Sequence, residues 1–176
     1  MERVPVIVST NSYVRLKYEL SEYITNNYDK ERYIHLRLHT LYGGKTLNTN
    51  LFLGKLVKSL ELGQVFEMSS GRQLRQYHHV DDILKILIGQ MEKDRSGVLE
   101  IGGLQAMTLR EIATLVVSNY GDVSKIKFSP RLDQDSDIYH SLEPAGLILS
   151  QRELRDRKSV ILRYVKQFLS RKSPNG

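Results

Sequence analysis

The sequence contains no cysteine. This absence excludes disulfide bonds, thiolate zinc sites and a cysteine nucleophile, and it makes a reducing, cytoplasmic compartment the expected one. Long apolar runs are also missing, because no segment approaches the roughly 18 residues that a membrane-spanning helix needs. The first residues lack the charged and then apolar pattern of a secretory signal peptide. We therefore expect a cytoplasmic protein that neither spans a membrane nor depends on disulfides.

An excess of one charge is missing from most of the chain. The 26 Lys and Arg residues against 20 Asp and Glu give a net charge of +6. Residues 151–172 carry all of this excess, and residues 1–150 are neutral. One hypothesis is that the basic segment binds the phosphates of a nucleic acid or an anionic surface. A solvated helix face explains the same charges more simply, so we favour that interpretation.

Helix-like and strand-like patterns alternate along the chain, which indicates an α/β fold. Apolar residues make up 40% of the sequence, a normal share for a globular protein. The stretch over about 131–144 is polar and is expected to form a loop or short turns. The spacing predicts helices over about 13–27, 50–61, 81–91, 108–119 and 152–170, and strands over about 33–38, 65–68, 98–101 and 125–129.

Local signals predict where several of these helices begin and end. Thr108-Leu-Arg-Glu111 fits a capping box, in which the threonine and the glutamate each satisfy a free backbone amide at the helix start. Gly63 is expected to end the helix over about 50–61, and Asp81 or Asp82 is expected to start the helix over about 81–91. The apolar residues of that following helix that we expect to be buried are Ile83, Leu84, Leu87 and Ile88.

Tyr13-Val-Arg-Leu-Lys17 is the first candidate catalytic pair. A spacing of four residues places both side chains on one helix face, one turn apart. A neighbouring ammonium group stabilises a phenolate, and this makes a tyrosine usable as a proton donor or acceptor beside a carbinol or ketone. The pattern is also common by chance, and the alternative is a half-buried tyrosine next to a solvated lysine.

Two further segments combine a strand with polar side chains. Arg37-Leu-His-Thr-Leu-Tyr-Gly43 runs into a glycine turn, and ligands commonly lie at strand ends in α/β sheets. In the segment 71–82, Arg75 can hold a phosphate with two parallel hydrogen bonds. His78 and His79 would point to opposite faces of a strand, so we predict no metal site. Ordinary strand and turn structure is the alternative for both segments.

The order of these segments carries more information than each one alone. It resembles the C-terminal part of the extended short-chain dehydrogenases/reductases, the NAD(P)-dependent nucleotide-sugar epimerases, dehydratases and ketoreductases. The resemblance covers about residues 5–145 and looks nearest to 4-keto-sugar reductases of the CDP-abequose type. The segments that carry it are Tyr13-x-x-x-Lys17, Arg37-Leu-His-Thr-Leu-Tyr-Gly43, Gly71-x-x-x-Arg75-x-x-x-x-Val80-Asp-Asp82 and Leu99-Glu-Ile-Gly-Gly-x-x-x-x-Thr108-Leu-Arg-Glu-Ile112.

The resemblance implies a catalytic and cofactor role for the first segments. Tyr13 would be the catalytic acid/base, and Lys17 would support it and hold the nicotinamide ribose. Tyr13, Lys17, His39 and Thr40 would together contact NAD or NADP, the implied cofactor.

The resemblance also implies where the substrate binds. Thr40 and Tyr42 would line the site of a nucleotide-diphosphate sugar. Arg75 matches the family arginine that contacts the diphosphate, and Arg131 follows Ser129-Pro130 where another phosphate-binding arginine often occurs.

The sequence departs from the family at its beginning. Twelve residues precede Tyr13, and no G-x-x-G-x-x-G turn is present to bind a dinucleotide pyrophosphate. We therefore expect the C-terminal portion of a Rossmann-type parallel sheet plus a small α/β substrate-binding lobe, with the N-terminal dinucleotide-binding half absent. Residues 1–45 would be the Rossmann remnant and 46–176 the lobe, interleaved with a returning helix and strand over about 80–103.

Such a fragment would leave apolar sheet and helix surfaces uncovered. We expect it to form a homo-oligomer or to pair with a separate N-terminal Rossmann half. Whether the chain catalyses anything alone is open: it is part of a nucleotide-sugar oxidoreductase, or a non-catalytic nucleotide-sugar-binding module.

Overall fold

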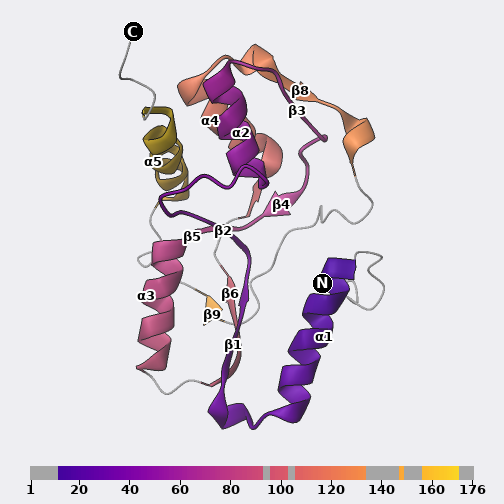
Figure 1. The fold of residues 1–176 in the computed structure, drawn as a ribbon, viewed down its shortest axis with the longest axis vertical. Coiled ribbons are helices and arrows are strands. Elements are labelled where there is room, and N and C mark those ends of the chain that lie inside the picture. Colours follow the sequence, from indigo (N-terminus) through magenta and orange to yellow (C-terminus); the bar gives the residue numbers. More distant parts are fainter. Residues whose placement is uncertain (1–11, 93–95, 103–105, 134–146, 149–155, 171–176) are drawn as a thin grey trace.

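The computed structural model describes residues 12–92, 96–102, 106–133, 147–148 and 156–170 (Figure 1). Helices and strands alternate, as the sequence predicts. The α-helices are α1 (Ser12–Asn27), α2 (Phe52–Leu62), α3 (Val80–Met91), α4 (Leu109–Tyr120) and α5 (Arg157–Leu169), and the short 3-10 turns are η2 (Lys30–Arg32), η3 (Val123–Lys125) and η4 (Pro130–Leu132). The strands are β1 (Ile34–Leu38), β2 (Thr40–Tyr42), β3 (Phe66–Met68), β4 (Leu74–Arg75), β5 (Tyr77–His79), β6 (Gly97–Gly102), β7 (Met107–Thr108), β8 (Ile126–Phe128) and β9 (Leu147–Ile148).

A three-stranded parallel sheet, in the order β1-β6-β9, forms one end of the molecule. Helices α1 and α3 lie on opposite sides of it in Figure 1. Ile83 of α3 and Ile101 of β6 form a small buried cluster between that helix and the sheet. A parallel sheet with helices on both sides is the arrangement expected of an α/β protein.

The other end of the molecule holds the main core. Helices α2, α4 and α5 pack together beside the parallel pair β3-β8 (Figure 1). Leu56, Ile112 and Ile161, one from each helix, are fully buried in this core. The Tyr120 hydroxyl donates to the Leu162 carbonyl at 2.9 Å and ties α4 to α5. Two short pairs, β2-β5 and β4-β7, lie between the two ends.

The local signals for two helix ends are confirmed. Thr108 Oγ1 accepts from the Glu111 amide, and the Glu111 carboxylate accepts from the Thr108 amide, which completes the capping box. Gly63 ends α2 in the left-handed conformation, with φ of 63°, as an α-helical C-cap glycine commonly does.

Two predictions about helix starts and burial are wrong. Helix α3 begins at Val80, because the His79 side chain accepts from the Asp81 amide and caps the helix one or two residues earlier than expected. Leu84 and Ile88, expected to be buried, are 50% and 57% exposed. Helix α5 begins at Arg157 with Asp156 as its cap. The expected start near residue 152 lies outside the described residues.

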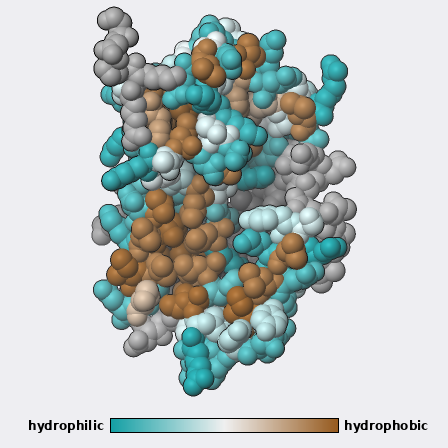
Figure 2. Space-filling model, in the orientation of Figure 1, coloured by the Kyte–Doolittle hydropathy of each residue, from teal (hydrophilic) through white to brown (hydrophobic). Residues whose placement is uncertain are grey.

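Exposed apolar side chains gather on α1 and α3. Figure 2 shows a broad hydrophobic area over α3 and beside it, and a narrower strip along α1. Among the helices that the structure describes, none is long and apolar enough to cross a membrane. The large hydrophobic residues of α1 and α3 that are exposed are Tyr13, Leu16, Leu20, Tyr23, Leu84, Ile88 and Met91.

Candidate functional site

Helix α1 brings Tyr13 and Lys17 together as their spacing predicts. The Lys17 ammonium lies over the Tyr13 ring, 5.6 Å from its centroid. Both side chains are open to solvent, and Tyr13 is 67% exposed. The pair is therefore accessible to a ligand rather than part of the core.

A contact that was not predicted from the sequence joins this helix to the sheet. Ser21 lies one turn after Lys17 on the same helix face, and it is buried. Arg37 of β1 donates to Ser21 Oγ from Nε at 3.1 Å and from Nη2 at 2.6 Å. The only signal in the sequence is the repeat of four residues from Tyr13 to Lys17 to Ser21, which continues the candidate face toward the sheet.

The segment after β1 leads into the middle of the molecule. Strand β2 pairs in parallel with β5, and the Thr40 amide donates to the Gln76 carbonyl at 3.0 Å. The ring of His39, between β1 and β2, faces the His78 ring at a tilt of 33°, with centroids 6.0 Å apart. Tyr42 is buried, and its ring packs edge-on against His79 and Tyr164 at centroid distances of 5.2 and 5.4 Å. The Tyr42 ring therefore contributes to the packing of β2 against β5 and α5.

A small pocket lies where β2 and β5 meet the first turn of α5. None of Tyr13, Lys17, Arg75 and Arg131 borders it. It is lined by Tyr42, Tyr77, His78, His79, Asp82, Arg157 and Val160.

His78 is the most strongly perturbed group of this pocket. Its side chain is 3% exposed, and its Nε2 has no hydrogen-bond partner among the residues that the structure describes. Burial lowers the pKa of His78 to about 4, and the charges of Arg157 and His39 act in the same direction, whereas Asp82 opposes them. The imidazole is therefore neutral at pH 7.

This burial predicts a loss of stability in acid. The unfolded chain takes up the His78 proton below its ordinary pKa of 6.5, whereas the folded chain does so only near 4. Stability is complete above pH 6.5 and falls as the pH drops from 6.5 toward 4, by about 2 kcal/mol at pH 5. Urea unfolding at pH 7.5 and pH 5 measures this loss. In His78→Phe the corresponding part of the pH dependence disappears, and an unchanged pH dependence would refute the assignment.

The predicted phosphate-binding arginines lie on different elements. Arg75 is half-buried on β4, which pairs with β7, and its Nη1 donates to the Leu74 carbonyl at 2.9 Å. Burial raises the pKa of Tyr77 to about 12, and the charge of Arg75 acts in the opposite direction. Arg131 is exposed on η4.

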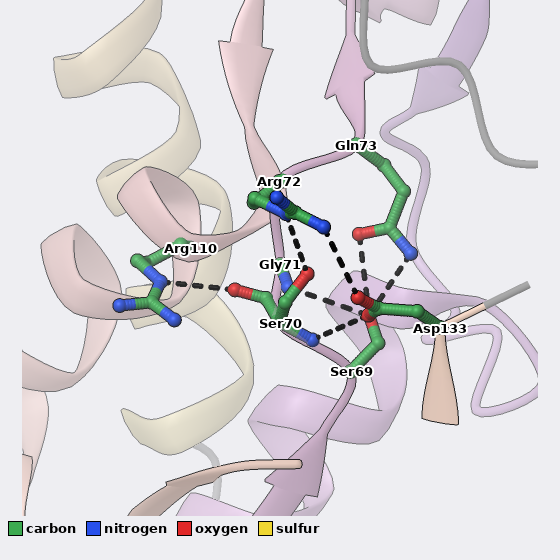
Figure 3. Close-up of polar contacts among 7 residues, drawn as sticks. All are labelled: Ser69, Ser70, Gly71, Arg72, Gln73, Arg110 and Asp133. Atoms are coloured by element: carbon green, nitrogen blue, oxygen red, sulfur yellow. Dashed lines mark hydrogen bonds and ion pairs between the residues drawn. The ribbon is translucent and has the colours of Figure 1, made fainter. Parts of the chain in front are cut away.

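A hydrogen bond connects the turn before Arg75 with the segment that carries Arg131, and it was not predicted from the sequence. The carboxylate of Asp133 accepts from the Ser70 amide, although the two residues are 63 positions apart (Figure 3). Nothing in the local sequence pattern indicates this contact, because it depends on the pairing of β3 with β8.

Comparisons with known proteins identify the family of this chain. The model of the NAD dependent epimerase/dehydratase family matches residues 2–102. The chain belongs to this family. The match includes Tyr13, Lys17, the segment 37–43 and Arg75, but it ends before Arg131. Comparison with curated protein sequences gives no match.

Solved structures of family enzymes share the fold. A UDP-N-acetylglucosamine 4-epimerase from Methanobrevibacter ruminantium, in complex with UDP-N-acetylmuramic acid, matches 93% of this chain at 20% identity, with a TM-score of 0.69. A dTDP-glucose 4,6-dehydratase from Bacillus anthracis, in complex with NAD, matches 93% of this chain at 13% identity, with a TM-score of 0.67. A UDP-glucose 4-epimerase from Thermotoga maritima, with UDP-glucose, matches 90% of this chain at 18% identity, with a TM-score of 0.68.

The chain spans about half the length of these proteins, between 53% and 55%. At these identities the comparisons show the fold and leave substrate and activity open.

Proposed function

We propose that this chain contributes the Tyr–Lys pair and the substrate-binding lobe of an NAD(P)-dependent nucleotide-sugar epimerase, dehydratase or ketoreductase. The observation that supports the proposal most is the exposed pair of Tyr13 and Lys17 on α1, within the part of the chain that matches the family. A 4-keto-sugar reductase of surface-polysaccharide synthesis, acting in the cytoplasm, is the finer assignment that we propose. Residues 1–45 would then belong to the Rossmann part and 46–176 to the lobe.

The exposure of the Tyr–Lys pair supports a role for α1 in binding the nicotinamide end of the cofactor. Lys17 and Tyr13 lie side by side and open to solvent, so the ammonium would hold the ribose. His39 and Thr40 would contact the cofactor where the chain leaves β1. The sequence has no glycine-rich turn for the pyrophosphate, so we propose that another part of the protein, on this or a second chain, supplies it.

The Tyr13 hydroxyl would transfer a proton to or from the sugar oxygen. The Lys17 ammonium would stabilise the negative charge that this transfer leaves on the phenol oxygen. When bound, NAD or NADP accepts or donates the hydride at the sugar carbon. The chain's own contribution is therefore proton transfer and orientation.

Arg75 and Arg131 would bind the diphosphate of the nucleotide sugar, with Thr40 and Tyr42 near the sugar. Guanidinium groups form paired hydrogen bonds with phosphate oxygens, and this favours arginine over lysine at such a site. Arg131 is exposed and Arg75 is half-buried, so Arg131 needs less rearrangement to meet a ligand.

The apolar faces of α1 and α3 support a partner for this chain. Leu16, Leu20, Ile88 and Met91 are between 47% and 61% exposed, and exposed apolar patches of this kind commonly mark interfaces. We propose that a dinucleotide-binding Rossmann half packs against these two apolar faces. A second copy of the chain, giving a homo-oligomer, is the alternative.

A melting series with nucleotide sugars tests the proposal. UDP-, CDP-, GDP- and dTDP-sugars are added separately, with NAD(H) and NADP(H) in parallel. One nucleotide sugar is expected to raise the melting temperature, since a ligand at a hundredfold excess over its Kd stabilises the folded state by about 2.7 kcal/mol. No shift with any nucleotide sugar would contradict the proposal.

Arg75→Ala provides the residue-level test of this binding. We expect its Kd for the stabilising nucleotide sugar to rise by about tenfold or more, since a hydrogen bond to a charged group contributes about 1.5–3 kcal/mol. Arg163→Ala is the control, because Arg163 is an exposed arginine on α5 that belongs to neither β4 nor η4, the elements that carry Arg75 and Arg131. Equal effects of the two substitutions would point to nonspecific electrostatics instead.

A non-catalytic nucleotide-sugar-binding module is the second candidate. This function would need Arg75 and Arg131 but no proton transfer by Tyr13. Binding of a nucleotide sugar with no turnover, even when the dinucleotide-binding half is supplied, would distinguish this function from the first.

A further inference from the structure

We propose that Asp133 is a positioning residue for the diphosphate site. It holds the segment that carries Arg131 against the turn that leads to Arg75, so that the two guanidinium groups act as one anion-binding element. The inference rests on the proposed function, since it takes a nucleoside diphosphate as the ligand of these arginines.

Strand pairing brings the two segments together. Strands β3 and β8 run parallel, with Met68 beside Phe128. Just after β8, the Ser129 amide donates to the Met68 carbonyl at 2.8 Å, and Ser129 Oγ donates to the Glu67 carboxylate at 2.7 Å. Because the strands are parallel, the segments that follow them leave the strand pair at the same end. One segment leads toward Arg75 and the other toward Arg131.

The Asp133 carboxylate joins these two segments just beyond the ends of β3 and β8. One oxygen accepts from the Ser70 amide at 2.7 Å, and the other lies 3.7 Å from Arg72 Nη2 (Figure 3). The Asp133 side chain is only 18% exposed. The hydrogen bond from Ser70 lowers the pKa of Asp133, so the carboxylate is charged at neutral pH.

Helix α4 holds the same turn from its other side. Arg110 Nε donates to the Ser70 carbonyl at 2.9 Å, and the Arg110 amide donates to the Gly71 carbonyl at 2.9 Å. The Arg110 guanidinium also stacks 3.9 Å from the centroid of the Phe128 ring. Ser70 therefore lies between Asp133 and Arg110 in Figure 3, and its backbone is fixed by both.

The path from Asp133 to Arg131 is a single tight turn. The amides of Leu132 and Asp133 donate to the carbonyls of Ser129 and Pro130 at 2.9 and 3.0 Å. Fixing the Asp133 carboxylate therefore fixes the backbone of Arg131, while its exposed side chain stays available. Order imposed before binding reduces the entropy lost when the ligand binds.

A double-mutant cycle in the full chain tests this coupling. UDP, dTDP, CDP and GDP are titrated calorimetrically, and the one that binds is compared with its nucleoside. Asp133→Ala is expected to weaken binding of the diphosphate about fivefold or more while binding of the nucleoside is unchanged. In an Arg131→Ala background the same substitution is expected to have little further effect, because the residue that it positions is gone. Asp133→Asn keeps an oxygen for the Ser70 amide and is expected to restore most of the affinity.

The outcomes separate the inference from the proposed function. If Arg75→Ala and Arg131→Ala weaken binding of the diphosphate but Asp133→Ala does not, the inference fails and the proposed function stands. Equal losses for nucleoside and diphosphate, or a full extra loss in the Arg131→Ala background, would mean that Asp133 only stabilises the fold. If no nucleoside diphosphate binds the wild-type chain, both proposals fail.

Discussion

Tyr13→Phe is expected to lower turnover by about 10²–10⁴-fold, the usual contribution of general acid–base catalysis. The substitution removes only the hydroxyl that would transfer the proton, and the ring remains beside Lys17. Affinity for the nucleotide sugar is therefore expected to change little. Turnover is measured in the protein that carries both this chain and the dinucleotide-binding half, by following conversion of the nucleotide sugar, and affinity is measured by calorimetry.

Tyr23→Phe is the matched control for this experiment. Tyr23 lies on the same helix and is exposed like Tyr13, but it lies outside the candidate pair. Its substitution is expected to leave turnover unchanged. If Tyr13→Phe were as active as wild type, Tyr13 could not be the acid/base, and the non-catalytic binding function would be favoured.

Gly71→Ala is expected to destabilise the fold by about 2–5 kcal/mol, through two separate costs. Gly71 has a φ of 72°, a conformation that costs an alanine about 1–2 kcal/mol. A Cβ atom there would also lie 2.9 Å from the Arg110 amide nitrogen and 2.8 Å from the end of Met68, and such overpacking adds about 1–3 kcal/mol. Urea unfolding measures the sum.

Gly44→Ala separates the two costs. Gly44 also has a positive φ, of 83°, but no atom lies within 4 Å of the position of its Cβ. Its substitution is expected to cost only the conformational part, about 1–2 kcal/mol. If both alanine variants lost the same stability, the close contact between the turn at Gly71 and α4 would not matter.

Features that depend on neighbouring residues were predictable from the sequence. The capping box of Thr108 and Glu111 and the C-cap at Gly63 are formed by groups a few positions apart, so their geometry follows from local backbone preferences. The pairing of Tyr13 with Lys17 belongs to the same class, because one helix turn brings them together whatever surrounds the helix.

Burial was less predictable than secondary structure. The apolar spacing of Leu84 and Ile88 shows that α3 has an apolar face, but it does not show what covers that face. His78 presents the opposite case, because a polar residue on a short strand became buried when α5 packed beside it. Both results depend on elements far away in the sequence.

The sequence by itself determined the alternation of helices and strands, the helix ends with local caps, and the candidate pair on α1, because each follows from contacts within about one helix turn. The tertiary structure alone decided which elements cover one another and which distant residues meet. The hydrogen bond from Ser70 to Asp133 exists because β3 and β8 pair in parallel, and the hydrogen bond from Arg37 to Ser21 exists because the chain folds back and places α1 beside β1. Long-range contacts of this kind require the chain to fold back on itself, so no local pattern encodes them.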